Sequence, residues 1–244
     1  MKKITLLLSA LFLAVTSYSQ VLISWDVSGV DLDTIYASSP HTFNGTLGTN
    51  IGGGALTLST TILHSTGSNE YGYKVSSDSA HVLAGTDKQT TLAGAITADH
   101  YIQFTLEAAD GYTFSISSID LRLTSTGSAS DSIALMTDVD NFVDGNEINA
   151  DDPDFTDATG LDVDKNISIS GSQYEGLSSL TFRIYGWGET GSGTTRIAND
   201  NGNDLVINGT TALAAVPESS TYALIFGAAT LGFVMYRRRS KRVS

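Results

Sequence analysis

Cysteine is absent from this sequence and proline is rare. Without cysteine no disulfide can form, so the stability of a folded domain must come from buried apolar surface or from bound ions. Only three prolines occur among the 244 residues, and two of them, Pro40 and Pro153, lie between residues 20 and 216. That stretch is rich in glycine, serine and threonine, which separate short apolar runs.

Basic residues are also few, and most of them lie at the two ends of the chain. The sequence has 13 lysines and arginines against 26 aspartates and glutamates. Between residues 20 and 216 there are six basic and 25 acidic residues, which gives a net charge of −19. This charge argues against nucleic-acid binding, because contacts to phosphate groups need positive charge.

Sequence signatures of enzymes are missing as well. The four histidines lack a metal-site spacing such as His-Glu-x-x-His, and no Gly-x-Ser-x-Gly motif of a hydrolase occurs. Among 25 acidic residues some pair would always look suitable for glycoside hydrolysis, so such a pair carries no information. We therefore expect a protein that is not an enzyme.

Helical periodicity is nearly absent between residues 20 and 216, apart from a turn near residues 92–99. Apolar residues instead alternate with polar ones, as Ile102, Phe104 and Leu106 do. Such period-two runs predict half-buried strands. Strands are expected at residues 21–27, 55–63, 71–75, 100–106, 112–124, 132–137, 166–170, 180–185, 194–198 and 204–208.

The number and length of these strands predict the fold class. In residues 112–124 the apolar alternation changes phase after Ser117 and Ser118, so a shift is expected within that strand. Many short strands separated by turns of glycine, asparagine, aspartate and serine are typical of all-β proteins. We expect a β-sandwich with a topology like that of a jelly roll.

The N-terminus has the pattern of a secretory signal peptide. Lys2 and Lys3 are followed by an apolar run over residues 4–15, and the small residues Ser17 and Ser19 come next. The apolar run is too short to span a membrane, and the small residues suit a cleavage site. The pattern predicts export of the chain and cleavage after Ser19.

The last 28 residues contain three parts in a fixed order. A short polar motif begins at Pro217, an uncharged apolar run spans residues 222–236, and a basic cluster follows. As a helix this run would be about 22 Å long, slightly less than the ~30 Å core of a bilayer. The basic cluster would hold the end of the chain in the cytoplasm. Its members are Arg237, Arg238, Arg239, Lys241 and Arg242.

This tail resembles a known sorting signal. Val216, Pro217, Glu218 and Ser219 lead into Ser-Thr-Tyr-Ala-Leu, a glycine-containing apolar run and three arginines, an order similar to the PEP-CTERM signal of exported Gram-negative proteins. Ser219 stands where that family usually has a second proline. The resemblance implies that an exosortase, a membrane-embedded cysteine transpeptidase-like enzyme, recognises the tail and removes it near the Pro-Glu motif.

The resemblance also implies partners and a location. The secretion machinery and the exosortase would be partners, and the inner membrane would hold the precursor transiently. The mature protein would then lie at the cell surface or outside the cell, associated with exopolysaccharide or biofilm. The expected parts are a signal peptide at residues 1–19, a β-sandwich ectodomain at 20–210, a linker at 211–216 and the sorting signal at 217–244.

Ten acidic residues and no basic one lie between residues 138 and 164. Crowded carboxylates are ligands that Ca²⁺ prefers, although the glycine and final glutamate of an EF-hand loop are missing. The alternatives are a calcium site and a solvated acidic loop that keeps the protein soluble. The candidate calcium ligands are Asp138, Asp140, Asp144, Asp162 and Asp164.

Two aromatic residues at the end of a predicted strand allow two interpretations. Trp187, flanked by Tyr185, could form an exposed platform that stacks on a sugar ring. Alternatively, Trp187 packs over the edge of the sandwich, which is the interpretation we favour.

Three Asn-x-Ser/Thr sequons begin at Asn44, Asn166 and Asn208. In a bacterial protein such sequons more often mark turns than glycosylation sites, and turns are expected here.

Two functions are compatible with the sequence. The first is a non-catalytic surface or matrix protein that its tail delivers to the cell envelope. The second is a carbohydrate-binding module, with or without Ca²⁺, that acts on extracellular polysaccharide.

Overall fold

The computed structural model describes most of the chain between residues 19 and 214. The chain divides into two compact units, Met1–Ala212 and Leu213–Ser244. The described residues are 19–26, 42–58, 63–64, 71–75, 89–127, 132–148, 162–188, 193–197 and 203–214, with 226–227, 230–231 and 233 further on.

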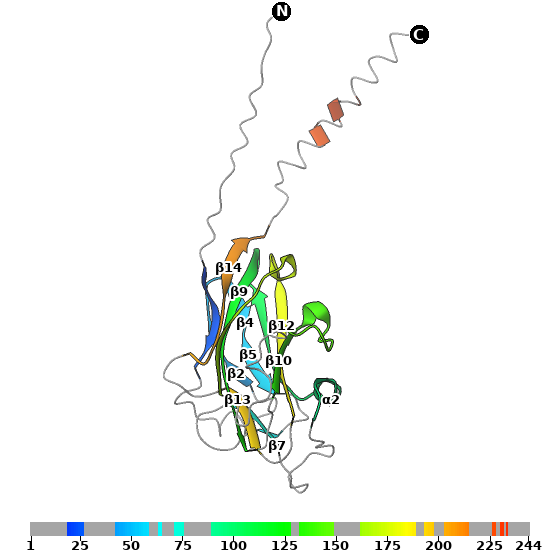
Figure 1. Cartoon of the computed structure of the whole chain (residues 1–244). Coiled ribbons are helices and arrows are strands. Elements are labelled where there is room, and N and C mark those ends of the chain that lie inside the picture. Colours follow the sequence, from blue (N-terminus) through cyan, green and yellow to red (C-terminus); the bar gives the residue numbers. More distant parts are fainter. Residues whose placement is uncertain are drawn as a thin grey trace, which may run out of the picture. The chain divides into compact units, whose positions relative to one another are not determined.

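The first unit is all-β, as predicted, and its strands form two antiparallel sheets (Figure 1). The eight-stranded sheet has the order β3-β1-β14-β9-β13-β7-β6, and β11 also pairs with β9. The six-stranded sheet has the order β10-β12-β8-β5-β2, and β4 also pairs with β8. The strands are β1 Gln20–Trp25, β2 Thr42–Asn44, β3 Thr46–Leu47, β4 Ile51–Gly53, β5 Ala55–Leu58, β6 Leu63–His64, β7 Tyr71–Val75, β8 Tyr101–Ala108, β9 Tyr112–Gly127, β10 Ser132–Thr137, β11 Asp162–Ser168, β12 Ser179–Trp187, β13 Gly193–Ile197 and β14 Leu205–Leu213.

Buried side chains of both sheets form one hydrophobic core. Trp25 of β1 brings the two sheets together, because its ring centroid lies 4.9 Å from that of Phe104 on β8. Phe104 in turn stacks on Phe182 of β12 at 4.9 Å. The predicted alternation is confirmed, since nine alternating apolar residues of β8, β9 and β12 are no more than 1% exposed. These residues are Ile102, Phe104, Leu106, Ile119, Leu121, Leu123, Leu180, Phe182 and Ile184.

The predicted change of phase within β9 is also confirmed. Phe114 and Ile116 are buried before it, and Ile119 is buried after it, so two consecutive residues separate the buried sets. A change of phase of this kind lets one long strand keep its apolar side chains on the core. It explains how β9 continues for 16 residues.

The chain passes repeatedly from one sheet to the other. From β8 to β13 each successive strand lies in the sheet opposite to the one before it. The first strand, β1, pairs with the last, β14. The two ends of the all-β unit are therefore neighbours in one sheet.

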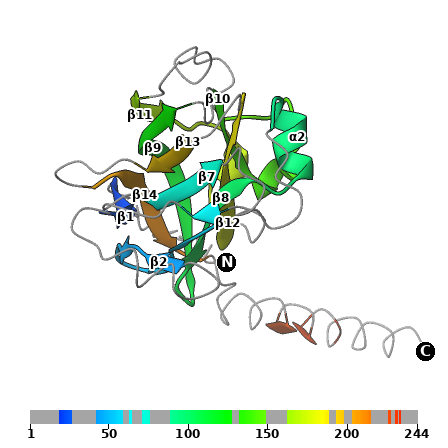
Figure 2. The same cartoon turned by 90° about the horizontal axis from the view of Figure 1, so that it is seen from below.

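The helical turn expected near residues 92–99 is present as α2, Leu92–Thr97. Thr91 caps it, and its side chain accepts a hydrogen bond from the backbone N–H of Gly94 at 3.1 Å. Leu92 and Ala95 pack with Tyr185 of β12 on the outer face of the six-stranded sheet. Figure 2 shows α2 on the side of the molecule away from β1 and β14.

Three short strands, β2, β3 and β4, were not predicted from the sequence. They contain or adjoin several glycines, which weaken a strand signal, but the glycines let the backbone approach Trp25 closely. The Gly54 carbonyl oxygen accepts hydrogen bonds from Trp25 Nε1 at 3.1 Å and from the Gly45 N–H at 2.9 Å. A Cβ atom at Gly45 would lie 2.7 Å from Trp25 Nε1.

The last strand of the all-β unit ends at a later residue than the predicted domain boundary at residue 210. β14 continues to Leu213, three residues into the segment expected to be a linker at 211–216. The apolar alternation weakens after Asn208, whereas the backbone pairing with neighbouring strands continues.

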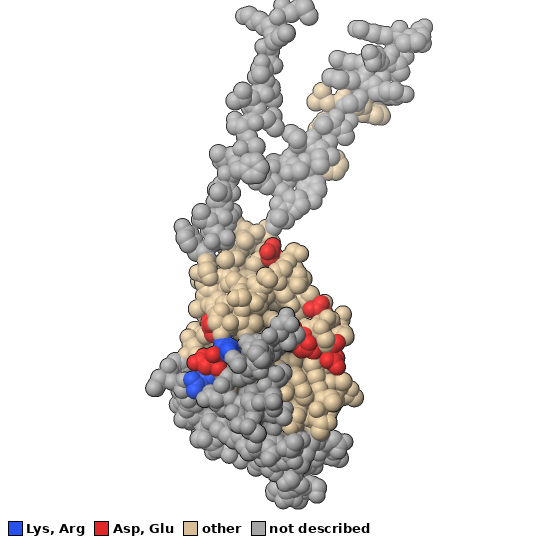
Figure 3. All heavy atoms as spheres, in the orientation of Figure 1, with Lys and Arg blue, Asp and Glu red and all other residues tan. Residues whose placement is uncertain are grey.

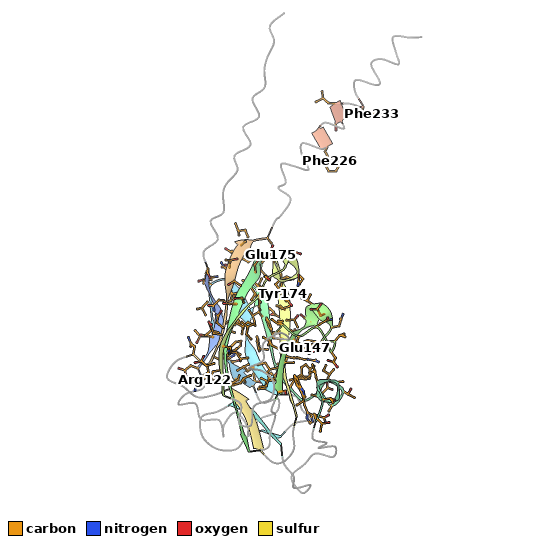
Figure 4. All side chains as sticks on the ribbon, viewed as in Figure 1. Arg122, Glu147, Tyr174, Glu175, Phe226 and Phe233 are labelled. Carbon is orange, nitrogen blue, oxygen red and sulfur yellow. The ribbon has the colours of Figure 1, made fainter. Side chains whose placement is uncertain are left out.

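Only five residues of the tail after residue 214 are described, and all five are helical. Thr230 Oγ1 donates a hydrogen bond to the Phe226 carbonyl at 2.7 Å. Phe226 and Phe233, labelled in Figure 4, are both exposed. Within the described part of the chain no helix is long and apolar enough to cross a membrane. The signal peptide, the sorting motif 216–219 and the basic cluster 237–242 lie outside the described residues.

Candidate functional site

The first half of the acidic segment lies directly after β10. Asp138–Asp140 form a short 3-10 helix, η2, and Asp144 and Glu147 follow. Two of these carboxylates bond backbone amides: Asp138 Oδ1 accepts from Thr181 at 3.1 Å, and Glu147 Oε1 accepts from Gly145 at 2.8 Å. Figure 3 shows acidic side chains gathered on this side of the unit.

The second half of the acidic segment is a strand, which corrects the prediction of one continuous loop. Asp162 and Asp164 belong to β11 of the eight-stranded sheet. Asp164 Oδ2 lies 3.6 Å from Arg122 Nη1, and the Asp164 side chain is 78% exposed, so this ion pair contributes little to stability. Figure 4 shows Arg122 and Glu147 on opposite sides of the unit. Of the candidate calcium ligands, Asp138, Asp140 and Asp144 therefore lie after β10, whereas Asp164 lies in a strand of the other sheet.

Calcium can be tested directly on the melting curve of the protein. Among the described residues no group of three or more acidic or histidine side chains is placed to hold a metal ion. If the segment nevertheless binds Ca²⁺ in the folded state alone, Ca²⁺ at a hundred times its dissociation constant raises the free energy of unfolding by about 2.7 kcal/mol. A solvated acidic loop predicts the same melting curve in Ca²⁺ and in chelator.

Tyr185 and Trp187 do not form an exposed aromatic pair. Tyr185 is fully buried, and its ring packs edge-on against Tyr101 with centroids 5.6 Å apart. Trp187 is half-buried and packs against the cluster that α2 forms on the outer face of the six-stranded sheet. A buried ring cannot stack on a sugar, so Tyr185 is not available as a carbohydrate contact.

Burial also affects the chemistry of Tyr185. Loss of solvent raises the pKa of its phenol, while a hydrogen bond from Arg183 and the positive charge of that residue oppose the shift. The hydroxyl is therefore protonated at neutral pH. It serves as a fixed hydrogen-bonding group for Arg183.

Arg183 is held rigidly on the same outer face. Its guanidinium lies 4.1 Å from the ring centroids of both Tyr101 and Phe142, an arrangement that favours cation–π attraction. Its Nε donates to Gln103 Oε1 at 2.8 Å, and its Nη1 donates to the Tyr185 hydroxyl at 3.1 Å. Among the described residues no carboxylate forms an ion pair with this arginine.

Arg183 belongs to a row of residues that crosses the six-stranded sheet. Thr57 of β5 pairs with Gln103 of β8, which pairs with Arg183 of β12 and then with Met136 of β10. In the next row Thr105 and Thr181 share a hydrogen bond of 3.0 Å between their hydroxyl oxygens. α2 and Phe142 pack over the part near Tyr185, whereas Thr105 and Thr181 are half-buried.

A hollow of about 330 Å³ lies beside Gln103 and Thr105 of β8. It forms where β4 and β5 separate along β8, since β4 pairs with residues 106–108 and β5 with residues 102–103. The residues that line it are Gly53, Gly54, Ala55, Thr57, Gln103, Phe104 and Thr105.

A polar network lies on the outer face of the other sheet and corrects the interpretation of two sequons. Asn166 is in β11 and Asn208 is in β14, so neither marks a turn. Both side-chain amides donate to Asp120 of β9, and Asn208 Nδ2 also donates to Ser118 Oγ at 3.2 Å. The network ties three strands together and leaves both carboxylate oxygens of Asp120 bonded.

The sequence contains only a weak signal for Gln103 and Arg183. Both occupy polar positions of alternating strands, and Arg183 is one of only six basic residues between residues 20 and 216. What places them side by side is the register of β8 against β12, which no sequence pattern specifies.

Comparison with protein-family models, with curated proteins and with solved structures gives no match to this chain. A proposal about function therefore rests on the residues and the geometry described above.

Proposed function

We propose that this chain is an exported, non-catalytic protein of the cell surface or extracellular matrix that is sorted and cleaved by an exosortase. The observation that carries the proposal is the order of the tail: a Pro-Glu motif at 217–218, an apolar run at 222–236 and a basic cluster. A signal peptide at residues 1–19 starts export, and the basic cluster stops it. The inner membrane holds the precursor until the tail is removed.

The all-β unit is the part that is delivered, and we take it to be a β-sandwich with a topology like that of a jelly roll. Two observations support this topology: successive strands from β8 to β13 alternate between the sheets, and the first strand pairs with the last. A net charge of −19 between residues 20 and 216 suits a solvated exterior role and keeps copies apart.

The proposal predicts that the mature protein lacks its tail. Mass spectrometry of protein recovered from the cell surface is expected to find a C-terminus near residues 216–219. A proline biases the residue before it away from helical geometry, so we expect the Val216–Pro217 segment to be a suitable substrate for an enzyme at the membrane face. Replacing Pro217 and Glu218 with alanine, or deleting the host exosortase, should leave the full tail and hold the protein in the inner membrane.

The matched control is Ser219→Pro, which restores the second proline of the family motif and should keep processing intact. An unprocessed C-terminus at Ser244 in surface protein, from cells that contain the exosortase, would reduce the tail to a plain membrane anchor.

A carbohydrate-binding module acting on extracellular polysaccharide is the second candidate function. The observation in its favour is the hollow on the outer face of the six-stranded sheet, which polar side chains line. Sites for small ligands are typically concave and hold a few well-placed polar groups.

A further inference from the structure

We infer that the hollow beside Gln103 and Arg183 binds a neutral sugar unit of an extracellular polysaccharide. The inference deepens the second candidate function and replaces the aromatic pair Tyr185 and Trp187 with a different site. Thr57, Gln103 and Thr105 of β5 and β8 line the hollow. The proposed site also includes Arg183 and Thr181 of the neighbouring strand β12, which do not line the hollow but pair with Gln103 and Thr105.

Arg183 and Gln103 provide hydrogen-bond donors at one end of the site. Arg183 uses Nε and Nη1 for Gln103 and Tyr185, and its Nη2 donates to no described residue and is not buried. Gln103 uses its Oε1 for Arg183, and its Nε2 is likewise without a partner among the described residues. Both groups therefore keep N–H donors for a ligand.

The donors are also held in position before a ligand arrives. The rings of Tyr101 and Phe142 clamp the guanidinium of Arg183, and the two hydrogen bonds to Gln103 and Tyr185 fix its plane. Side chains ordered in advance lose little conformational entropy on binding, which favours affinity.

Hydrogen-bond acceptors and hydroxyls complete the site. Thr105 and Thr181 share one hydrogen bond between their hydroxyls, so lone pairs remain available on both oxygens. Glu107, which is exposed, lies beside the hollow, because a Cβ atom on Gly53 would be 3.5 Å from Glu107 Cγ. Sugar hydroxyls both donate and accept, so they can bond the amide and guanidinium at one end and the carboxylate at the other.

The size and charge of the site narrow the class of sugar. At about 330 Å³ the hollow is at the small end of ligand sites, which suits a single sugar ring of a chain that continues over the surface. Glu107 and the net charge of −19 between residues 20 and 216 disfavour a polyanionic chain such as a polyuronate. Phe104 lines the hollow but is only 1% exposed, so binding depends on hydrogen bonds and not on ring stacking.

The test is titration of the full chain, purified in a detergent without a sugar headgroup, by isothermal calorimetry. The probes are neutral oligosaccharides built from glucose, galactose, mannose and N-acetylglucosamine, together with an oligomer of polygalacturonate. At least one neutral probe should bind, and the polygalacturonate oligomer should bind more weakly. Binding of no neutral probe, or stronger binding of the polyuronate, would overturn the inference.

Gln103→Glu provides the sharpest variant. It keeps an oxygen acceptor for Arg183 Nε, and so preserves the clamp, but it removes the Nε2 donors that face the ligand. Loss of a hydrogen bond of this kind should weaken binding about tenfold. Arg122→Lys on the eight-stranded sheet is the matched control and should leave binding unchanged. Equal binding by Gln103→Glu and the original protein would also contradict the site.

These outcomes are separable from those of tail processing. Calorimetry on purified protein does not depend on an exosortase, and mass spectrometry of the C-terminus does not depend on sugar binding. A protein whose tail is processed and which binds no sugar would retain the structural role alone.

Discussion

Replacement of Trp25 by alanine is expected to lower the free energy of unfolding of the all-β unit by about 3–5 kcal/mol, the range for large aromatic residues in cores. Trp25 is only 1% exposed and belongs to the eight-stranded sheet, but its ring contacts Phe104 of the six-stranded sheet. Its Nε1 also bonds the Gly54 carbonyl at 3.1 Å. Alanine would leave a cavity between the sheets and remove that hydrogen bond.

The loss can be measured by urea unfolding followed by far-UV circular dichroism, which does not depend on tryptophan fluorescence. Val21→Ala is the matched control, because Val21 lies on the same strand and is 44% exposed. Val21→Ala should change the free energy of unfolding by no more than about 0.5 kcal/mol. A Trp25→Ala variant as stable as this control would contradict the placement of Trp25 between the sheets.

The second large effect is expected at Gly209 of β14. A Cβ atom at this position would lie 2.0 Å from the backbone oxygen of Ser115 on β9 and 2.8 Å from Leu22 Cδ1. The contacted oxygen belongs to the backbone and cannot rotate away, so β14 and β9 would have to move apart. Gly209→Ala should destabilise the unit by about 3 kcal/mol, the upper part of the usual range for overpacked sites.

Gly52→Ala on β4 is the control for this substitution. The nearest atom to its Cβ would be the Glu107 backbone oxygen at 3.9 Å, an ordinary contact. Because alanine restricts the unfolded chain, this change should be neutral or should stabilise by about 0.4–1 kcal/mol. In thermal melting, Gly209→Ala should have a lower melting temperature than Gly52→Ala. Equal melting temperatures would contradict the close approach of β14 to β9.

Much of the strand content was predictable because it depends on local alternation. The expected strands at 71–75 and 132–137 have the observed bounds, and the phase change in β9 is where the apolar pattern placed it. The strands β2, β3 and β4 were not predicted because they have only two or three residues each, too few to show an alternation, and glycines lie in or beside them. The tertiary structure explains two of these glycines, since a Cβ atom at Gly45 would meet the Trp25 side chain and one at Gly54 would meet the Ile23 side chain.

The acidic segment shows why spacing in sequence is a poor guide to a site. Asp138 and Asp164 are 26 positions apart in one acidic run, but Asp138 directly follows β10 of the six-stranded sheet, whereas Asp164 lies in β11 of the eight-stranded sheet. The crossing between sheets is a property of the whole fold, and no local pattern reports it. The same holds for Asn166 and Asn208, which meet at Asp120 although 42 positions separate them.

The sequence by itself determined which side of each strand is apolar, since alternate side chains point to opposite faces, and it determined the order of the parts at the two termini. Only the tertiary structure decided which polar positions remain accessible. Tyr185 and Arg183 lie on the same face of β12, two positions apart, but α2 covers Tyr185, while Arg183 keeps its Nη2 open. The physical reason is that burial of an outward side chain depends on a segment about 90 positions away in the chain, which packs there through contacts that no local pattern encodes.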